Sequence, residues 1–229
     1  MKPAPIILIA LAATLPSAAA LAYFVIWAGH PLAAVIYGGT KLMMIGLLVG
    51  LWRTGRLPAI PQMDATPRSA WREGLLVGAI MATLIIAVSL GPLAGLWHDA
   101  TPRIAAKVAE FHMDSLVTYL LGALAISVVH SLLEELYWRR LVFGGLLGRV
   151  PAAAAHLLAG LAFAGHHIVI AGIYAGWGAG VALGLLVGAA GVAWSVLARR
   201  HGGLTGAWIV HAACDIALLA LGWRAITAI

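Results

Sequence analysis

Ionisable residues gather in the second half of the chain at spacings that suit catalysis. They form three groups, which are His130, Glu134, Glu135 and Arg139, then His156, His166 and His167, and finally His211 and Asp215. Side chains four residues apart share one face of a helix. His130 is therefore expected near Glu134 if this segment is helical, and His211 near Asp215. A carboxylate beside imidazoles can activate a water molecule for hydrolysis.

The members of these groups can be given roles in hydrolysis of an amide bond. Glu134 would act as general base towards the attacking water, which His167 would hold or help to deprotonate. His211 could donate a hydrogen bond to the developing oxyanion. Glu135 and Arg139 can neutralise one another, so we expect Glu134 to be the acid that lacks such a partner. A zinc site is the alternative, because two histidines and one glutamate are a ligand set of catalytic zinc, here Glu134, His167 and His211.

The composition places these residues in a membrane protein. Hydrophobic residues make up 63% and charged residues 10% of the 229 residues, whereas about 25% are charged in a typical soluble domain. This excludes a soluble enzyme and a disordered regulator, and the single cysteine, Cys214, cannot form a disulfide within the chain. Apolar stretches of about 20 residues can each cross a bilayer. They predict an all-α polytopic helix bundle with spans at 5–28, 31–52, 75–97, 115–138, 150–170, 176–198 and 204–223.

Two features of this span assignment are open to test. An eighth membrane helix could lie in 101–113 or 139–148, which would make eight spans instead of seven. The apolar character of the first span continues well past its signal-like start, so we expect a retained helix, kinked at Pro16. The whole chain, 1–229, would then form one integral membrane domain.

The basic residues predict the orientation. Those on the side of the N-terminus are Lys2, Arg53, Arg56, Arg68, Arg72, Arg139, Arg140, Arg149, Arg199 and Arg200. Only Arg103, Lys107 and Arg224 fall on the other side, so the positive-inside rule predicts a cytoplasmic N-terminus. The net charge of +6 is thereby explained by topology and by contact with anionic lipid headgroups. Nothing indicates a nucleic acid partner.

Ionisable groups inside a span are costly, at about 2.5 kcal/mol or more each, and two adjacent glutamates repel one another. We therefore interpret the three groups as functional, not as hydrogen bonds that only join helices. His130 and His166 are assigned supporting or packing roles, His156 a structural role, and Cys214 a place in the core. Lys41, in the second span, could snorkel or pair with a carboxylate.

Helix geometry brings the principal residues to one level. We expect a hairpin turn at Arg149–Pro151, with Glu134 and His167 each about 22–24 Å from it at 1.5 Å per residue. Glycines four residues apart, at Gly176, Gly180, Gly184 and Gly188, predict a smooth helix face for close packing. Tryptophans near the span ends suit an interfacial belt, and these are Trp52, Trp71, Trp97, Trp208 and Trp223.

Three short motifs carry a family resemblance. Glu134-Glu135-Leu-Tyr-Trp-Arg139 fits E-E-x-x-x-R, Phe163-Ala-Gly-His-His167 fits F-x-x-x-H, and His211-Ala-Ala-Cys-Asp215 fits H-x-x-x-N/D. In this order, on successive membrane helices, they resemble the motifs of the CPBP family of intramembrane proteases. That family includes the type II CAAX prenyl endopeptidase of eukaryotes and bacterial bacteriocin-processing and self-immunity proteins. The resemblance covers 115–223, which would be the catalytic core.

The resemblance implies a bundle of about eight helices around a polar cavity open to the cytoplasm. Glu134 would match the catalytic glutamate, His167 its water-holding partner, and Glu135 and Arg139 the supporting ion pair next to Phe163. His211 and Asp215 would match the pair that stabilises the oxyanion. The family is generally regarded as glutamate-type, which implies no cofactor, with zinc the less favoured case. Asp215 replaces the commoner asparagine, so it must be protonated to donate, or else orient His211. Arg140 stands where the family often has glycine, which could alter the exit of the helix.

These features favour an intramembrane endopeptidase in which Glu134 activates water. Its partners would be membrane lipids and a peptide or membrane-protein substrate, and its place the bacterial cytoplasmic membrane. A catalytically silent immunity or scaffold protein of the same family is one alternative. A proton-coupled transporter is another, but the two halves show no matching interrupted helices. The sequence has no His-Glu-x-x-His, Gly-x-Ser-Gly or Gly-x-Gly-Asp motif, which excludes three other designs of intramembrane protease.

Overall fold

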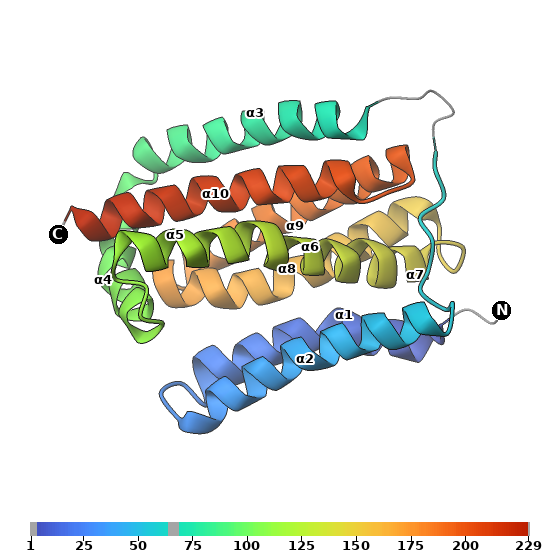
Figure 1. Cartoon of the computed structure of the whole chain (residues 1–229), viewed down its shortest axis with the longest axis horizontal. Coiled ribbons are helices and arrows are strands. Elements are labelled where there is room, and N and C mark those ends of the chain that lie inside the picture. Colours follow the sequence, from blue (N-terminus) through green and yellow to red (C-terminus); the bar gives the residue numbers. More distant parts are fainter. Residues whose placement is uncertain (1–3, 64–68, 229) are drawn as a thin grey trace. The chain divides into compact units, whose positions relative to one another are not determined.

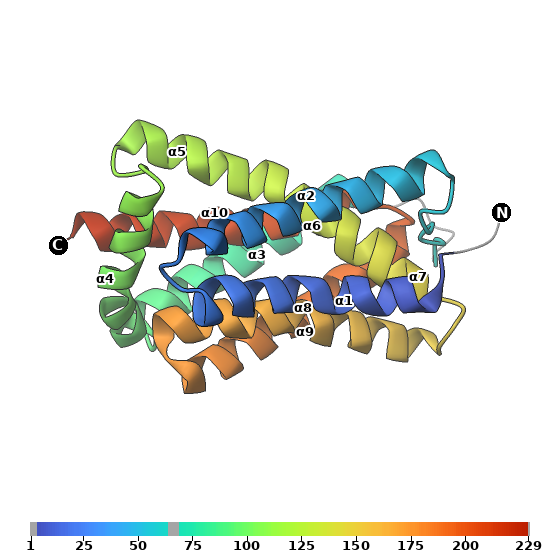
Figure 2. The same cartoon turned by 90° about the horizontal axis from the view of Figure 1, so that it is seen from below.

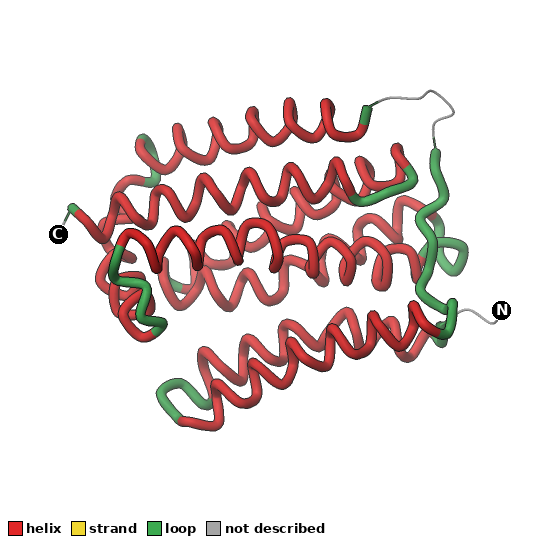
Figure 3. Tube along the Cα trace, in the orientation of Figure 1, coloured by secondary structure: helices red, strands yellow, loops and turns green. Residues whose placement is uncertain are grey.

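The computed structural model describes residues 4–63 and 69–228, and over these residues the chain is helical with short connections and no strand (Figures 1 and 3). The α-helices are α1 Ile6–Leu21, α2 Pro31–Arg53, α3 Ala70–Leu90, α4 Ala94–Glu110, α5 Leu116–Leu124, α6 Ser131–Glu135, α7 Gly144–Leu146, α8 Ala152–Ala175, α9 Trp177–His201 and α10 Thr205–Thr227. Wider π-helical turns occupy Ala22–Ile26, Ala125–His130 and Leu136–Phe143. Lys2 and Arg68, two of the basic residues predicted on the side of the N-terminus, lie outside the described residues.

The described residues contain seven helices that are long and apolar enough to cross a membrane, which confirms the all-α polytopic class. These spans are Ile6–Ile26, Pro31–Arg53, Ala70–Leu90, Leu116–Leu146, Ala152–Ala175, Trp177–His201 and Thr205–Thr227. Pro16 lies inside the first of them. The prediction that the helices enclose a polar cavity stays a prediction.

The third and fourth predicted spans differ most from the structure in their bounds. The third ends at Leu90, not 97, because Gly91 and Pro92 open a turn before α4. Helix α4 overlaps the segment 101–113, but it carries several charged residues and is not one of the seven spans. The fourth span does not end at 138 but continues through Arg139 and Arg140 to Leu146. The segment 139–148 is therefore no separate helix.

The chain divides into two compact units. Unit 1 comprises Met1–Ala65 and Glu134–Leu204, and unit 2 comprises Thr66–Leu133 and Thr205–Ile229. The change from unit 2 to unit 1 falls between Leu133 and Glu134, within α6. That 1–229 acts as one domain with a catalytic core at 115–223 stays a prediction.

In unit 1, α8 and α9 form a closely packed hairpin, and α1 lies along α8 (Figure 2). A Cβ placed on Gly188 would come within 2.8 Å of the Ala164 Cβ, and one placed on Gly184 within 2.7 Å of the Ile168 backbone nitrogen. Side chains larger than hydrogen are therefore excluded there, as the spacing of the glycines predicted. Gly176 differs, because it precedes α9 with a φ of 84° that favours glycine.

Several polar contacts join the connections at one end of unit 1. Arg149 donates to the Ala4 carbonyl, Arg140 Nε donates to the Pro58 carbonyl at 2.6 Å, and the Met63 N–H donates to the Arg199 carbonyl at 2.9 Å. The turn before α8 lies where it was expected, with Gly148 at a φ of 79° and Pro151 as the cap residue. Arg140, Arg149 and Arg199 thus contact the connections at one end of this unit.

In unit 2, α3 runs along α10 (Figure 1). A Cβ on Gly74 would come within 2.9 Å of the Gly206 carbonyl oxygen, so these helices also meet at glycines. The Tyr119 hydroxyl donates to the Leu219 carbonyl at 2.8 Å and ties α5 to α10. The buried Cys214 belongs to the apolar face of α10, as predicted.

Candidate active site

The two glutamates of the first motif lie in a short α-helical stretch between two wide turns. Helix α6, Ser131–Glu135, is preceded by the π-helical residues Ala125–His130 and followed by Leu136–Phe143. Wide turns of this kind are frequent at functional sites. The residues after Glu135 are almost all buried, which anchors this part of the helix in unit 1.

Glu135 and Arg139 form a closed ion pair. Arg139 Nε donates to Glu135 Oε2 at 2.9 Å and Nη2 to Oε1 at 3.4 Å, and both side chains have 0% exposure. The guanidinium carbon also lies 5.2 Å from the centre of the Phe163 ring and 5.8 Å from that of Trp194. Arg139 is therefore held by charge and by two aromatic faces. This confirms that Glu135 and Arg139 pair.

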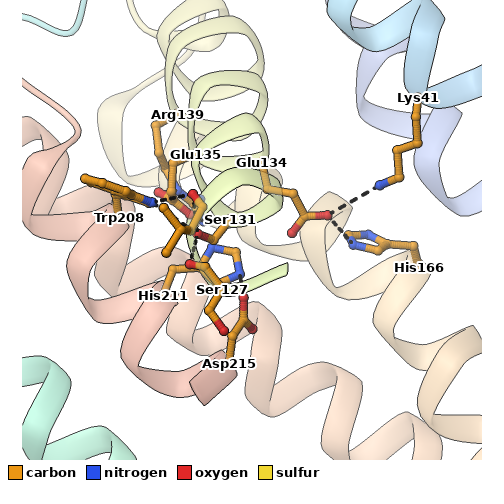
Figure 4. A network of polar contacts seen from close by, with 11 residues as sticks. Lys41, Ser127, Ser131, Glu134, Glu135, Arg139, His166, Trp208, His211 and Asp215 are labelled. Carbon is orange, nitrogen blue, oxygen red and sulfur yellow. Dashed lines mark hydrogen bonds and ion pairs between the residues drawn. The ribbon is translucent and has the colours of Figure 1, made fainter. Parts of the chain in front are cut away.

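Glu134 has two basic neighbours that come from other helices. Its Oε1 lies 3.9 Å from Lys41 Nζ of α2 and 3.5 Å from His166 Nε2 of α8 (Figure 4). The carboxylate side chain is 5% exposed. The expectation that Glu134 lacks a partner is therefore wrong, because a lysine distant in sequence supplies the counter-charge.

His167 is oriented by the other end of its own motif. Its Nδ1 lies 3.0 Å from the Phe163 carbonyl oxygen, which can only accept. Nδ1 must then carry the hydrogen, and in the neutral ring Nε2 is the acceptor. The four-residue spacing of F-x-x-x-H thus supplies the backbone oxygen that fixes the tautomer. Such a nitrogen can bind a water molecule or a metal ion.

His166 is the member of the site that sequence reasoning placed in a lesser role. Its ring stacks on Trp138 at an interplanar angle of 0° and a centroid distance of 5.6 Å, and it lies 4.0 Å from the His167 ring. Both of its nitrogens are buried, with no hydrogen-bond partner within the described part of the chain. The sequence does show two adjacent histidines, His166 and His167, but the F-x-x-x-H motif includes only His167.

Three donors could hold a metal ion. One ligand atom each from Glu134, His166 and His167 lies within 4.8 Å of the others. This set differs from the expected one, because His166 takes the place that sequence reasoning gave to His211. Two imidazoles and a carboxylate suit zinc in kind and number. However, the Lys41 ammonium beside the same Glu134 oxygen would repel a bound cation.

The third motif lies in unit 2. His211 Nε2 is 3.8 Å from Asp215 Oδ2, which is close enough for an ion pair but too long for a hydrogen bond. Nearby on α10, Trp208 Nε1 donates to the Val128 carbonyl at 3.0 Å and lies 3.1 Å from Ser131 Oγ (Figure 4). Trp208 is therefore tied by hydrogen bonds to the Val128–Ser131 segment of this unit, and its place in an interfacial belt stays a prediction. The oxyanion role of His211 and Asp215 stays a prediction.

His156 has a structural environment, as expected. Its Nδ1 lies 2.6 Å from the Ser195 hydroxyl, and its ring stacks on Phe143 at 4.4 Å. The contact between His156 and Ser195 therefore ties α8 to α9.

The segment that carries the three motifs matches a known family. Residues 116–217 match the family described as Rce1-like, type II CAAX prenyl endopeptidase Rce1-like. This match confirms the resemblance to the CPBP family, and it supports a CAAX-type protease at the level of the family. No curated protein and no solved structure matches the chain.

Proposed function

We propose that this protein is an intramembrane endopeptidase in which Glu134 activates the attacking water. The observation that carries the proposal is the position of Glu134 in a nearly closed site, within reach of two imidazoles and one ammonium group. The match to a family of CAAX-type endopeptidases supports the same reaction class.

The reaction follows from the donors and acceptors of these groups. Water binds between the Glu134 carboxylate and Nε2 of His167, and its oxygen attacks the carbonyl carbon of the scissile amide. The water proton passes to Glu134 while the carbonyl oxygen becomes an oxyanion, for which we propose His211 as a donor. Glu134 then returns the proton to the amide nitrogen, the C–N bond breaks, and a carboxylic acid and an amine leave. Asp215, 3.8 Å from His211, would orient that imidazole.

A zinc-dependent form of the same peptidase is the second candidate, favoured by the three donors at Glu134, His166 and His167. In that case the ion would polarise the scissile carbonyl or activate the water. We favour the metal-free reaction because Lys41 already neutralises the Glu134 carboxylate. Inhibition by a chelator that added zinc reverses would instead support the metal-dependent form.

For its location we propose the bacterial cytoplasmic membrane, with the N-terminus in the cytoplasm. The arginines that share one end of unit 1 support this orientation through the positive-inside rule. The substrate would be a peptide or a membrane protein that reaches the site from the bilayer. Cleavage of peptides with and without a prenylated cysteine tests whether it carries a lipid.

Cleavage by purified protein in lipid nanodiscs tests the proposal. Wild type is compared with Glu134→Gln and with Glu110→Gln, which removes an exposed glutamate of α4 as a matched control. Fluorogenic peptides with and without a prenylated cysteine are the probes. We expect cleavage by wild type and Glu110→Gln and none by Glu134→Gln.

Two results would contradict this assignment. Cleavage that survives in Glu134→Gln would reject the glutamate mechanism. If wild type cleaves nothing while the protein retains a biological effect that Glu134→Gln leaves intact, a binding role as an immunity or scaffold protein becomes the better interpretation.

A further inference from the structure

Lys41 lies outside the segment that matches the family, yet it contacts the residue on which the reaction depends. It belongs to α2, whereas the family match begins at residue 116. Its Nζ lies 3.9 Å from Glu134 Oε1, and its side chain is 25% exposed. One turn earlier on α2, the centre of the Tyr37 ring lies 5.4 Å from the ammonium.

The depth of Lys41 shows that it is not a lysine that reaches for the membrane surface. It follows Pro31 by ten residues and precedes Arg53 by twelve. At 1.5 Å per residue it lies about 15 Å from one end of the helix and about 18 Å from the other. Both distances exceed the length of a lysine side chain, so snorkelling is excluded. A cation at this depth costs about 2.5 kcal/mol or more unless it is paired.

Stability alone does not account for this pair. A buried ion pair can often be replaced by well-packed apolar residues without loss of stability, because both charges must be taken out of water. The 3.9 Å separation is also longer than a hydrogen bond. The neighbouring pair is different, since Arg139 makes two bonds to Glu135 and leaves no charge over for Glu134.

We propose that Lys41 is a positioning residue of the active site. Its ammonium supplies the counter-charge that an ionised Glu134 requires in a medium of low dielectric constant, and with His166 it holds Oε1 in place. The carboxylate is then ready to take the proton of the water. This inference rests on the proposed endopeptidase function, and it makes the second span a part of the active site.

The test compares the rate constants of Lys41 variants in nanodiscs with the peptide that wild type cleaves. Lys41→Gln and Lys41→Met remove the charge, Lys41→Arg keeps it, and Lys107→Met removes the lysine of a surface pair in α4 as the matched control. We expect kcat to fall about 10- to 100-fold in the neutral variants, somewhat less than for loss of an oxyanion donor. We expect KM to change little, and Lys41→Arg to recover most of kcat. Lys107→Met should match wild type.

Lys41→Arg and Lys41→Gln distinguish an effect of the charge on catalysis from an effect on folding. Their cleavage rates are compared provided that their melting temperatures are equal. If both variants cleave at the same rate, the inference is wrong. The Glu134→Gln variant, measured beside them, separates the two proposals. Loss of cleavage in Glu134→Gln with full activity in Lys41→Gln would overturn only the role of Lys41, whereas cleavage by Glu134→Gln would overturn both.

Discussion

Glu134 and Glu135 are consecutive residues of one helix, but their carboxylates are held in different ways. Glu135 is bound by a residue of its own helix, four positions later, at 2.9 Å and with 0% exposure. Glu134 is approached by residues of two other helices, at 3.5 and 3.9 Å. The described partner of Glu135 comes from its own helix, while those of Glu134 depend on how separate helices pack.

This difference separates a structural acid from a reactive one. A carboxylate that accepts two bonds from one guanidinium is fixed in position and charge. The contacts of Glu134 to a lysine and an imidazole are longer, at 3.9 and 3.5 Å, which suits a carboxylate that changes its protonation during a reaction. The neighbours therefore divide the two tasks that the pair performs in the proposed mechanism, since Glu135 orders the helix and Glu134 moves the proton.

The largest predicted effect is the difference in peptide cleavage between Glu134→Gln and Glu135→Gln. Glu134→Gln should lower kcat of the folded protein by about 10³-fold or more, in the range for loss of an acid–base group, which far exceeds any loss of folded protein. Glu135→Gln should instead lower the melting temperature and leave the folded fraction active. Peptide cleavage and thermal unfolding of both variants test this, and equal loss of activity at unchanged stability would remove the distinction.

Arg139→Met should come next in size. It leaves the Glu135 carboxylate buried without its partner, so we expect a loss of about 3–5 kcal/mol in the free energy of unfolding. The double variant Glu135→Gln/Arg139→Met removes both charges and should regain most of that loss. Denaturant titration in detergent measures it, and a double variant no more stable than Arg139→Met would contradict a closed pair.

His167→Gln should lower kcat by about 10²-fold, because the variant loses the acceptor nitrogen that the Phe163 carbonyl orients. The control is His156→Gln, which removes a histidine of the same helix that contacts Ser195. We expect its kcat to stay near that of wild type. If kcat fell by a similar factor in both variants, the effect would not be specific to His167, and the proposed mechanism would be contradicted.

The smallest effect is expected where helix packing sets the position of α8. Gly184→Ala would push on the backbone of Ile168, next to His167, and should cost about 1–3 kcal/mol. Gly178→Ala is the control, since a Cβ at Gly178 meets nothing within 4 Å. The Glu135–Arg139 pair lies within one helix and should not be affected by a shift of α8. The contact of Glu134 with His166 of α8 should be affected, so Gly184→Ala should lower kcat more than expected from its lost stability. A loss of kcat no greater than the loss of folded protein would contradict this.

The sequence predicted those features that depend on neighbours in the chain. Apolar stretches located the seven spans, and four-residue spacing located the Glu135–Arg139 pair and the bond between His167 and Phe163. A carboxylate partner for Lys41 was one of the two expectations, but its identity as Glu134 and the contact of His166 with Glu134 escaped prediction because these contacts join different helices. Spacing along one helix carries no information about which faces of two helices meet. The third span was misplaced because the turn at Gly91–Pro92 was read as helix.

The glycines between α8 and α9 have a consequence at the level of the gene. A Cβ on Gly180 would come within 2.5 Å of the Gly172 backbone nitrogen, and one on Gly188 within 2.9 Å of the Gly160 carbonyl oxygen. Every single-base change in a glycine codon that alters the amino acid yields a residue with a Cβ or a stop. No missense mutation that arises in one step at these positions can therefore preserve the distance between the two helices. We expect variation within natural populations to be rarer at these codons than at the codon of Gly178.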